Sequence, residues 1–270
     1  MDISVVIPVL NGQPFLSEQL DAVLAQQFSG AFELVVVDNG SSDGTVETIK
    51  SFCARDARVR FVDGGNLPLG GAAAVNEGVR QSRSDLIARC DADDVVHPGW
   101  LQAVYDGLLE GVPIVCCTLD YGSLNPYIKQ SGLPYLTKSL EGAGGAWGFR
   151  RDLFLVMGGL PVEQHLCDVA FLHRLKHERG IVPVFVPNAI ISIRMRYSAR
   201  ERYRRGYEHG VQFSRIHREG VYPRPHGHHL SRMAWLVYRS PWLLTPRRYM
   251  WWDNCAHLHG RLADQIVRRS

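Results

Sequence analysis

Residues 34–45 read LVVVDNGSSDGT, and this stretch decides the fold class that we expect for the chain. The apolar, mostly β-branched run at its start predicts a buried strand. A polar turn follows, and an amphipathic helix is expected from Thr45 to Phe52, with Ser41, Ser42 and Asp43 available as caps. A buried strand that passes through a short turn into a helix is typical of an α/β protein.

The flanking segments repeat this alternation. Further strands are predicted at residues 3–8, 59–62, 86–88, 112–119 and 190–193, and further helices at 14–27, 70–79 and 98–109. Fully apolar strands separated by helices predict a mixed, mostly parallel sheet with helices on both faces. Ligands bind such sheets beyond the carboxyl ends of the strands, where Asp38 and Asp91 lie in the sequence.

Length and composition exclude several classes of protein. The chain has 270 residues, a length that suits one large α/β domain or one domain with an appendage. Its 46% hydrophobic and 21% charged residues are ordinary for a folded protein and argue against wholesale disorder. No apolar run approaches the ~18 residues that cross a bilayer, and the first residues do not resemble a signal peptide. The six cysteines form no CxxC pair, so we expect them to be reduced and the protein to be cytoplasmic.

The charge is distributed unevenly along the chain. Residues 1–190 hold 14 Lys and Arg against 22 Asp and Glu, whereas residues 191–270 hold 16 Arg, no Lys and 5 acidic residues. This asymmetry indicates that the tail meets phosphate, an anionic surface or an acidic partner. The alternative is a solvated basic helix face.

Three carboxylates follow the fourth predicted strand, at Asp91, Asp93 and Asp94. Packed like charges repel unless a cation or hydrogen-bond donors compensate them. Oxygen ligands with spare coordination positions suit Mg²⁺ or Mn²⁺ held jointly with a diphosphate. The alternative is that one carboxylate caps the helix that starts near Pro98 and the others are solvated.

Taken together, five segments in this order resemble the family 2 glycosyltransferases of the GT-A fold. They are residues 5–12, 36–45, 66–78, 91–101 and 149–160. The resemblance implies a catalytic domain over 1–195, with a nucleotide-binding half at 1–120 and an acceptor-binding half at 121–195. A helical, Arg- and Trp-rich extension at 196–270 would follow. Leu67-Pro68 form a two-residue extension relative to the family pattern.

The resemblance also implies roles for individual residues. Asp38 would accept a hydrogen bond from the imide N–H of uracil or thymine, or, as the alternative, only stabilise the turn at Gly40 and Ser41. Asp93 would be the direct ligand of Mn²⁺ or Mg²⁺, and Asp91 would contact the metal shell or the donor ribose. The other nucleotide-binding positions implied are Pro8, Val9, Asn11, Asn66, Asn76 and Ala92.

The catalytic base is expected at Asp168. The family usually carries a Glu-Asp pair at the start of a helix, and here Cys167 replaces the glutamate while Ala170 replaces a frequent third acid. Asp168 would accept the proton of an acceptor hydroxyl, and a helix N-terminus is expected to lower its pKa. The alternatives are that Asp168 only caps the helix, or that Glu163 or His165 serves as the base.

The tail carries further candidate residues. In the family an arginine-rich segment lies near the diphosphate, which makes Arg194 and Arg196 candidates for contacting it. His209 or His217 could complete a metal shell. Residues 230–252 mix apolar residues and four tryptophans with arginines, which fits a helix on an anionic membrane surface. A helical hairpin that packs on the catalytic domain or on a second subunit, giving a homodimer, is the alternative.

The resemblance therefore implies an inverting, metal-assisted glycosyltransferase that uses a nucleoside-diphosphate-sugar, with UDP or dTDP preferred over GDP. The acceptor would be a glycan, a lipid-linked molecule or a small molecule, as in cell-envelope polysaccharide biosynthesis, with peripheral attachment to the inner face of the membrane as a further hypothesis. No nucleic-acid partner is expected. The main alternative is a catalytically silent nucleotide-binding scaffold. A nucleotidyltransferase is disfavoured because Asn11-Gly12 and their neighbours offer no cationic phosphate loop.

Overall fold

The computed structural model describes residues 1–126, 136–138, 145–162 and 167–195, together with isolated positions between 203 and 259. The chain divides into two compact units. The first comprises Met1–Leu124, Tyr135–Glu163 and Cys167–Arg194, and the second comprises Asn125–Pro134, Gln164–Leu166 and Met195–Ser270. The elements described below belong to the first unit.

The N-terminal part of the sheet is parallel. Strand β1 pairs with β2 on one side and with β4 on the other, and β2 pairs with β3. The bounds are Ile3–Val9 for β1, Phe32–Asp38 for β2, Val59–Asp63 for β3 and Leu86–Arg89 for β4. Every residue of β1 and β2 is buried, as expected for strands covered on both faces.

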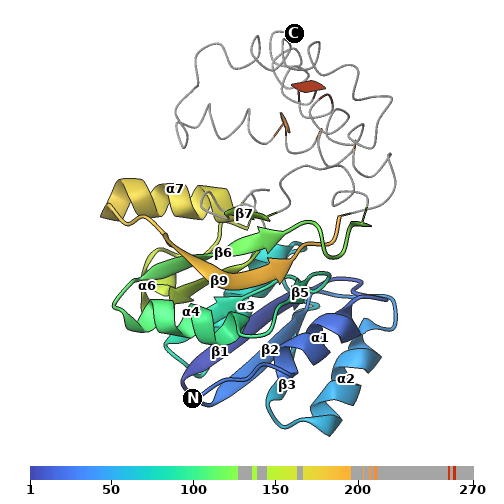
Figure 1. Cartoon of the computed structure of the whole chain (residues 1–270). Coiled ribbons are helices and arrows are strands. Elements are labelled where there is room, and N and C mark those ends of the chain that lie inside the picture. The colour runs from blue at the N-terminus through green and yellow to red at the C-terminus, as the bar shows by residue number, and fades with distance from the viewer. Residues whose placement is uncertain are drawn as a thin grey trace. The chain divides into compact units, whose positions relative to one another are not determined.

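The other part of the sheet is mixed. It contains β5 (Val95–Val96), β6 (Ile114–Asp120), β7 (Leu136–Lys138), β8 (Trp147–Arg150) and β9 (Val184–Ser192). Strand β8 runs antiparallel to both β4 and β6, whereas β6 and β9 are parallel. The described strands follow the order β3-β2-β1-β4-β8-β6-β9-β5, with β7 paired to β6 (Figure 1).

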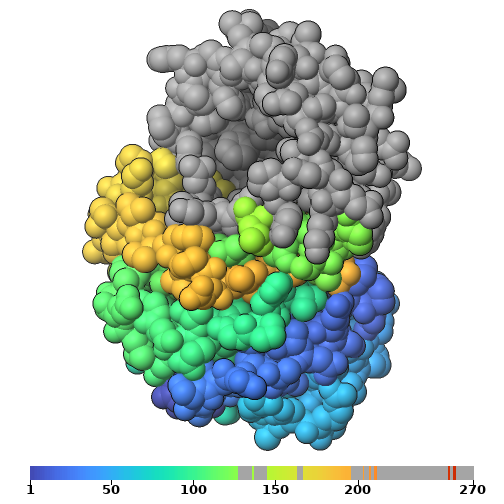
Figure 2. All heavy atoms as spheres, in the orientation of Figure 1, coloured from blue at the N-terminus to red at the C-terminus, as the bar shows by residue number. Residues whose placement is uncertain are grey.

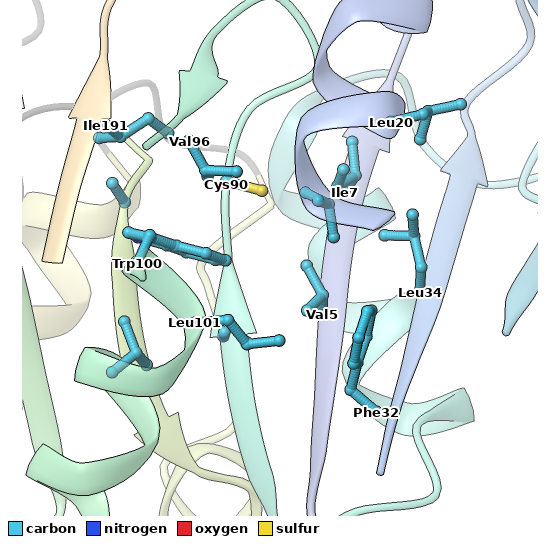
Figure 3. Packing of buried hydrophobic residues seen from close by; sticks show 14 of the residues in the cluster. Val5, Ile7, Leu20, Phe32, Leu34, Cys90, Val96, Trp100, Leu101 and Ile191 are labelled. Carbon is cyan, nitrogen blue, oxygen red and sulfur yellow. The ribbon is translucent and has the colours of Figure 1, made fainter. Parts of the chain in front are cut away.

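Helices cover both faces of this sheet. The described helices are α1 (Leu16–Leu24), α2 (Thr45–Arg55), α3 (Gly71–Gln81), α4 (Trp100–Leu109), α6 (Arg151–Val156) and α7 (Cys167–Arg179). Alternate residues of β1 point to opposite faces. Val5 and Ile7 belong to a core that also holds residues of α1 and α4 (Figure 3) and of α2. Val6 belongs to a second core, with residues of α3, α6 and α7. The far end of α7 reaches solvent, where Lys176–Arg179 are exposed on the yellow surface in Figure 2.

The predicted α/β class and sheet with helices on both faces are confirmed. The strand expected at 190–193 is the end of the longer β9, and the helix expected at 14–27 is confined to Leu16–Leu24. No described helix combines the length and apolar composition needed to cross a bilayer. Residues 196–202 and 230–252, on which the predicted extension and its membrane-facing segment depend, lie outside the described residues.

A buried acidic residue joins three strands at the amino-terminal edge of the sheet. The side chain of Glu33 is 1% exposed and accepts hydrogen bonds from Ser4 Oγ at 2.7 Å and Arg60 Nη1 at 2.7 Å. The backbone N–H of Arg83 donates a further hydrogen bond at 2.6 Å. Burial alone would raise the pKa of Glu33, but these hydrogen bonds outweigh it and hold the pKa below its ordinary value.

We expect Glu33→Gln to lower the free energy of unfolding by about 2–3 kcal/mol at pH 7, because a buried carboxylate loses its charged hydrogen bonds. Since the folded pKa lies below the unfolded pKa, this contribution is present at neutral pH and is lost as pH falls through the folded value. Urea denaturation of both proteins at pH 7 and pH 3 measures it. The exposed Glu47→Gln is the control. A difference in stability between wild type and Glu33→Gln that stays constant down to pH 3 would contradict the assignment.

Candidate functional site

The carboxyl ends of β1, β2 and β4 meet at one edge of the sheet. Val9 of β1 is in register with Asp38 of β2, and the backbone N–H of Asn39 donates to Val9 O at 2.8 Å. On the other side of β1, Val6 is in register with Arg89, the last residue of β4. The buried Pro8 and Val9, Asp38 and the segment from Asp91 to Asp94 therefore start from neighbouring strand ends.

Asp38 has two different carboxylate oxygens. Its Oδ2 accepts the backbone N–H groups of Gly40 at 3.1 Å and Ser41 at 3.0 Å, so the predicted turn is present. Its Oδ1 is buried and has no hydrogen-bond partner among the described residues. A buried acceptor without a donor is costly, and in a native protein it calls for an explanation such as a ligand.

The loops after β1 and β2 are tied together. Asn11, whose φ of 53° is left-handed, donates its backbone N–H to Ser41 Oγ at 2.7 Å, and its Oδ1 accepts from the backbone N–H of Ser42 at 2.9 Å. Asn11 thus lies beside the turn that Asp38 forms. In this structure the Asn11 side chain holds the loop after β2 through Ser42. A nucleotide would therefore contact the two joined loops together.

Asn39 and Asn76 hold two other loops. The Asn39 side chain donates to Gly64 O and Pro68 O at 3.2 and 3.3 Å and accepts from Gly70 N at 2.7 Å, which fixes the segment containing the Leu67-Pro68 extension. Asn66 lies exposed in that segment. The Asn76 amide makes paired hydrogen bonds with the backbone of Leu160, both at 2.8 Å. Asn76 is therefore engaged with the chain after α6.

The acidic segment carries concentrated negative charge. Asp91 Oδ1 accepts from Arg89 Nη2 at 2.7 Å, and its side chain is 33% exposed. Asp94 is buried, and burial together with the charges of Asp91 and Asp93 raises its pKa well above the ordinary value. Asp94 therefore takes up a proton more readily than an ordinary aspartate. The partly buried Asp91 and Asp93 lie beside it in the same segment.

A side chain of helix α1 holds the backbone of this segment. The fully buried Gln19 donates its Nε2 to Asp91 O at 2.9 Å and accepts from Val96 N at 3.1 Å. In the loop after the helix, the Gln26 side chain donates to His97 O at 3.0 Å and accepts from Leu101 N at 3.1 Å. The buried Ala92 packs in the same core as α1. The loop that carries the aspartates is consequently held at both ends.

Arg194 closes the other side of the acidic segment. Its backbone N–H donates to Asp94 Oδ1 and its Nε donates to Asp93 O, both at 2.9 Å. Its guanidinium also pairs with Glu18 and lies 4.3 Å from the ring centre of Phe15. The contacts of Arg194 in this structure are with the protein itself, and its contact with a diphosphate stays a prediction. The other diphosphate candidate, Arg196, lies outside the described residues.

Asp168 is the second residue of α7, and its Oδ1 accepts the backbone N–H of Val169 at 2.9 Å. Burial is the largest influence and raises the pKa of Asp168 to about 6, against the opposing effects of Arg89 and of the backbone N–H. The expectation that the helix N-terminus would lower this pKa is wrong, because the loss of solvent outweighs the hydrogen bond and the helix dipole. Glu163, His165, His209 and His217 lie outside the described residues.

Two residues that the sequence did not single out shape the site. Arg89 is buried beneath Asp91, and Gln19 fixes the backbone of Asp91. An arginine inside an apolar strand and a glutamine on the apolar face of a helix are the signals that could have found them. Both are polar residues at core positions, where an unpaired group is expensive.

The donor set fits a divalent cation in chemistry. Asp91 and Asp93 supply carboxylate oxygens, which Mg²⁺ and Mn²⁺ prefer. Burial is the main reason why the pKa of Asp94 is raised, and the charges of Asp91 and Asp93 add to it. No group of three or more His, Cys, Asp and Glu side chains is placed for metal binding within the described part of the chain. A cation would therefore take some of its ligands from a diphosphate or from water.

A family model described as glycosyl transferase family 2 matches residues 4–157, more than half of the chain. The chain belongs to glycosyltransferase family 2. Glycosyltransferase GlyG of Streptococcus pneumoniae is 34% identical over 165 residues, which cover 57% of this chain and 54% of GlyG. The uncharacterized glycosyltransferase YibD of Escherichia coli is 25% identical, with 81% of this chain and 64% of YibD covered. The chain thus spans less than two thirds of either relative.

Solved structures share the fold of this family 2 chain. A mannosyltransferase from Pyrobaculum calidifontis, PcManGT, in complex with GDP-Man and Mn²⁺, superimposes with a TM-score of 0.70 at 19% identity, covering 99% of this chain and 88% of that one. S. aureus TarS 1-349 in complex with UDP-GlcNAc gives a TM-score of 0.60 at 14% identity, covering 100% and 92%. The likeness confirms the predicted GT-A fold.

Proposed function

We propose that this chain is an inverting glycosyltransferase that moves a sugar from a UDP- or dTDP-sugar to an acceptor hydroxyl, with a divalent cation and Asp168 as general base. The observation that carries the proposal is the buried Oδ1 of Asp38, which has no hydrogen-bond partner among the described residues. Asp38 lies at the same sheet edge as Asp91 and Asp93. Ligands of open α/β sheets bind at this edge. Membership of the family supports the reaction class.

The proposed nucleotide depends on how many oxygens of the Asp38 carboxylate can accept a hydrogen bond from the base. Uracil and thymine present one imide N–H between two carbonyl groups, and one acceptor is sufficient for it. Guanine presents two neighbouring donors on its Watson–Crick edge, which would require both oxygens of a carboxylate. Asp38 Oδ2 is already bound by Gly40 and Ser41, so we favour UDP or dTDP over GDP.

Asp93, with Asp91, would hold Mn²⁺ or Mg²⁺, and the cation would neutralise charge that develops on the departing nucleoside diphosphate. Arg194 would keep this segment in place, since it binds the backbone of Asp93 and the carboxylate of Asp94. Glu18 already neutralises part of its charge. We therefore propose that Arg194 acts mainly on the position of the aspartates.

Asp168 would take the proton of the acceptor hydroxyl as its oxygen attacks the anomeric carbon. The bond from that carbon to the diphosphate oxygen breaks on the opposite face, so the anomeric configuration inverts. A base with a pKa of about 6 is ionised at neutral pH and is more basic than an ordinary aspartate. We propose a glycan, lipid-linked or small-molecule acceptor; the composition of residues 230–252 supports peripheral attachment to an anionic membrane.

A thermal-shift screen of UDP, dTDP and GDP with and without Mn²⁺ tests the nucleotide and the metal. We expect UDP and dTDP with Mn²⁺ to stabilise the protein, by about 2.7 kcal/mol at 100-fold above Kd, and GDP to do so less. Asp93→Ala should remove the increment that depends on Mn²⁺, whereas the exposed control Asp85→Ala should keep it. Stabilisation by GDP alone would overturn the assignment of Asp38.

Release of UDP or dTDP from a panel of nucleotide-sugars, measured with Mn²⁺, separates an enzyme from a silent binder. We expect slow donor hydrolysis by water even without the natural acceptor. Binding of UDP with Mn²⁺ but no release from any sugar in the panel, with or without added glycan acceptors, would identify the chain as a nucleotide-binding scaffold.

A further inference from the structure

A buried arginine lies at the end of β4, beside the acidic segment of the proposed site. Arg89 ends β4, is 9% exposed, and donates from Nη2 to Asp91 Oδ1 at 2.7 Å. Its positive charge also acts on Asp168 at the start of α7, where it favours the ionised carboxylate. A buried guanidinium is expensive unless negative groups compensate it, and these are two such groups.

The fold holds this guanidinium tightly. Arg89 is in register with Trp147 of the antiparallel β8, and Gly145 precedes that strand. A Cβ built on Gly145 would lie 2.0 Å from Arg89 Nη1 and 2.5 Å from Asp91 Oδ2. Only glycine fits there without displacing the arginine–aspartate pair. The backbone at Gly145 therefore restricts where the guanidinium can lie.

The neighbouring Cys167 thiol does not contribute charge at this place. Burial raises the pKa of Cys167 to about 11, so this thiol is neutral at physiological pH and neither repels nor neutralises the carboxylates. The charged groups with the largest effects on the pKa of Asp168 are Arg89, the last residue of β4, and Asp91, two residues beyond it. They act in opposite directions, and the backbone N–H of Val169 assists Arg89.

We propose that Arg89 is a positioning residue that orients Asp91 and supplies the positive charge facing Asp168. The proposal rests on the proposed function, because it assigns Arg89 to the same site. It accounts for an arginine in a buried strand, for its bond to Asp91 and for the glycine packed against it. A single side chain would then link the residue that meets the donor to the residue that deprotonates the acceptor.

Removal of the Arg89 charge should raise the pKa of Asp168. Without the guanidinium, burial and the charge of Asp91 would act on Asp168 against the backbone N–H alone, so the pKa of Asp168 would rise above about 6. We expect the pKa of Asp168 to rise by more than about 0.3 unit in Arg89→Gln, because the charge that favours its ionised form is gone. A larger share of the base is then protonated at neutral pH.

The pKa of Asp168 can be followed by carboxyl ¹³C NMR of the full chain, with the resonance assigned by its absence in Asp168→Asn. Arg89→Lys keeps the charge and should leave this pKa within about 0.5 unit, although it loses the fork geometry and should weaken binding of UDP with Mn²⁺. Gly145→Ala displaces the guanidinium without removing an ionisable group, and should raise the pKa as well. Gly145→Ala replaces Arg89→Gln as the test variant if Arg89→Gln does not fold.

Arg60→Gln is the matched control, since it also breaks an arginine–carboxylate pair, at the opposite edge of the sheet. It should cost stability and leave the Asp168 pKa unchanged. The proposal is overturned if Arg89→Gln and Gly145→Ala both leave that pKa within about 0.3 unit of wild type, or if Arg89→Lys raises it as much as Arg89→Gln. The NMR titration needs no turnover, so absence of sugar release counts against the proposed function and not against this role.

Discussion

Asp168→Asn should lower the rate of sugar transfer by about 10²–10⁴-fold while UDP binds as tightly as to wild type. The amide keeps the size of the carboxylate and can still accept the backbone N–H of Val169, so the start of α7 should be preserved. It cannot accept the proton of the acceptor hydroxyl. The loss should therefore appear in kcat, measured as product formed with the donor and acceptor that the screens identify.

The exposed Asp106→Asn on α4 is the control for the same chemical change, and it should retain full activity. Near-full turnover by Asp168→Asn with intact UDP binding would remove Asp168 from the mechanism. In wild type, the rate should rise with pH through the pKa of about 6 and level off above it, because the base must be deprotonated. A profile that is flat from pH 5 to pH 8 would show that another group takes the proton.

The long elements of this fold follow from local sequence. Buried strands such as β1 and β2 are built around apolar runs, Val5–Val9 and Leu34–Val37. Helices such as α2 and α4 follow turn residues and show one apolar face. The short strands β5, β7 and β8 were not predicted. Two to four residues do not establish a period, and such strands exist because partner strands from distant parts of the chain offer hydrogen bonds.

The site could be predicted only in part. That Asp38 and Asp91 lie at the same edge follows from their positions after parallel strands. The contacts of Arg89 and Gln19 depend on side chains that meet across the fold, and a linear sequence does not show which groups those are. The pKa of Asp168 was predicted in the wrong direction for the same reason, since a helix terminus is visible in sequence and burial is not.

Asp38→Asn should weaken binding of UDP by about ten- to a hundredfold, because a hydrogen bond to a charged acceptor contributes about 1.5–3 kcal/mol. The amide oxygen can replace Oδ2 in accepting from Gly40 and Ser41, which preserves the turn. The amide nitrogen then occupies the place of Oδ1, where it presents a donor to the imide N–H of uracil. Isothermal titration of UDP with Mn²⁺ measures the loss.

Asp63→Asn is the matched control, because Asp63 ends the neighbouring β3, lies in register with Asp38 and accepts from Gly65 N at 2.9 Å. Its side chain is exposed, so binding of UDP should not change.

A comparison of UDP with CDP tests whether Asp38 contacts the base. Cytosine carries an acceptor at N3 where uracil carries a donor, so the wild-type carboxylate should bind UDP and disfavour CDP. Asp38→Asn reverses the polarity of that single position and should improve CDP relative to UDP. Equal loss of both nucleotides would mean that Asp38 only shapes the turn, whereas a change in their ratio requires that its Oδ1, unpaired among the described residues, faces the base.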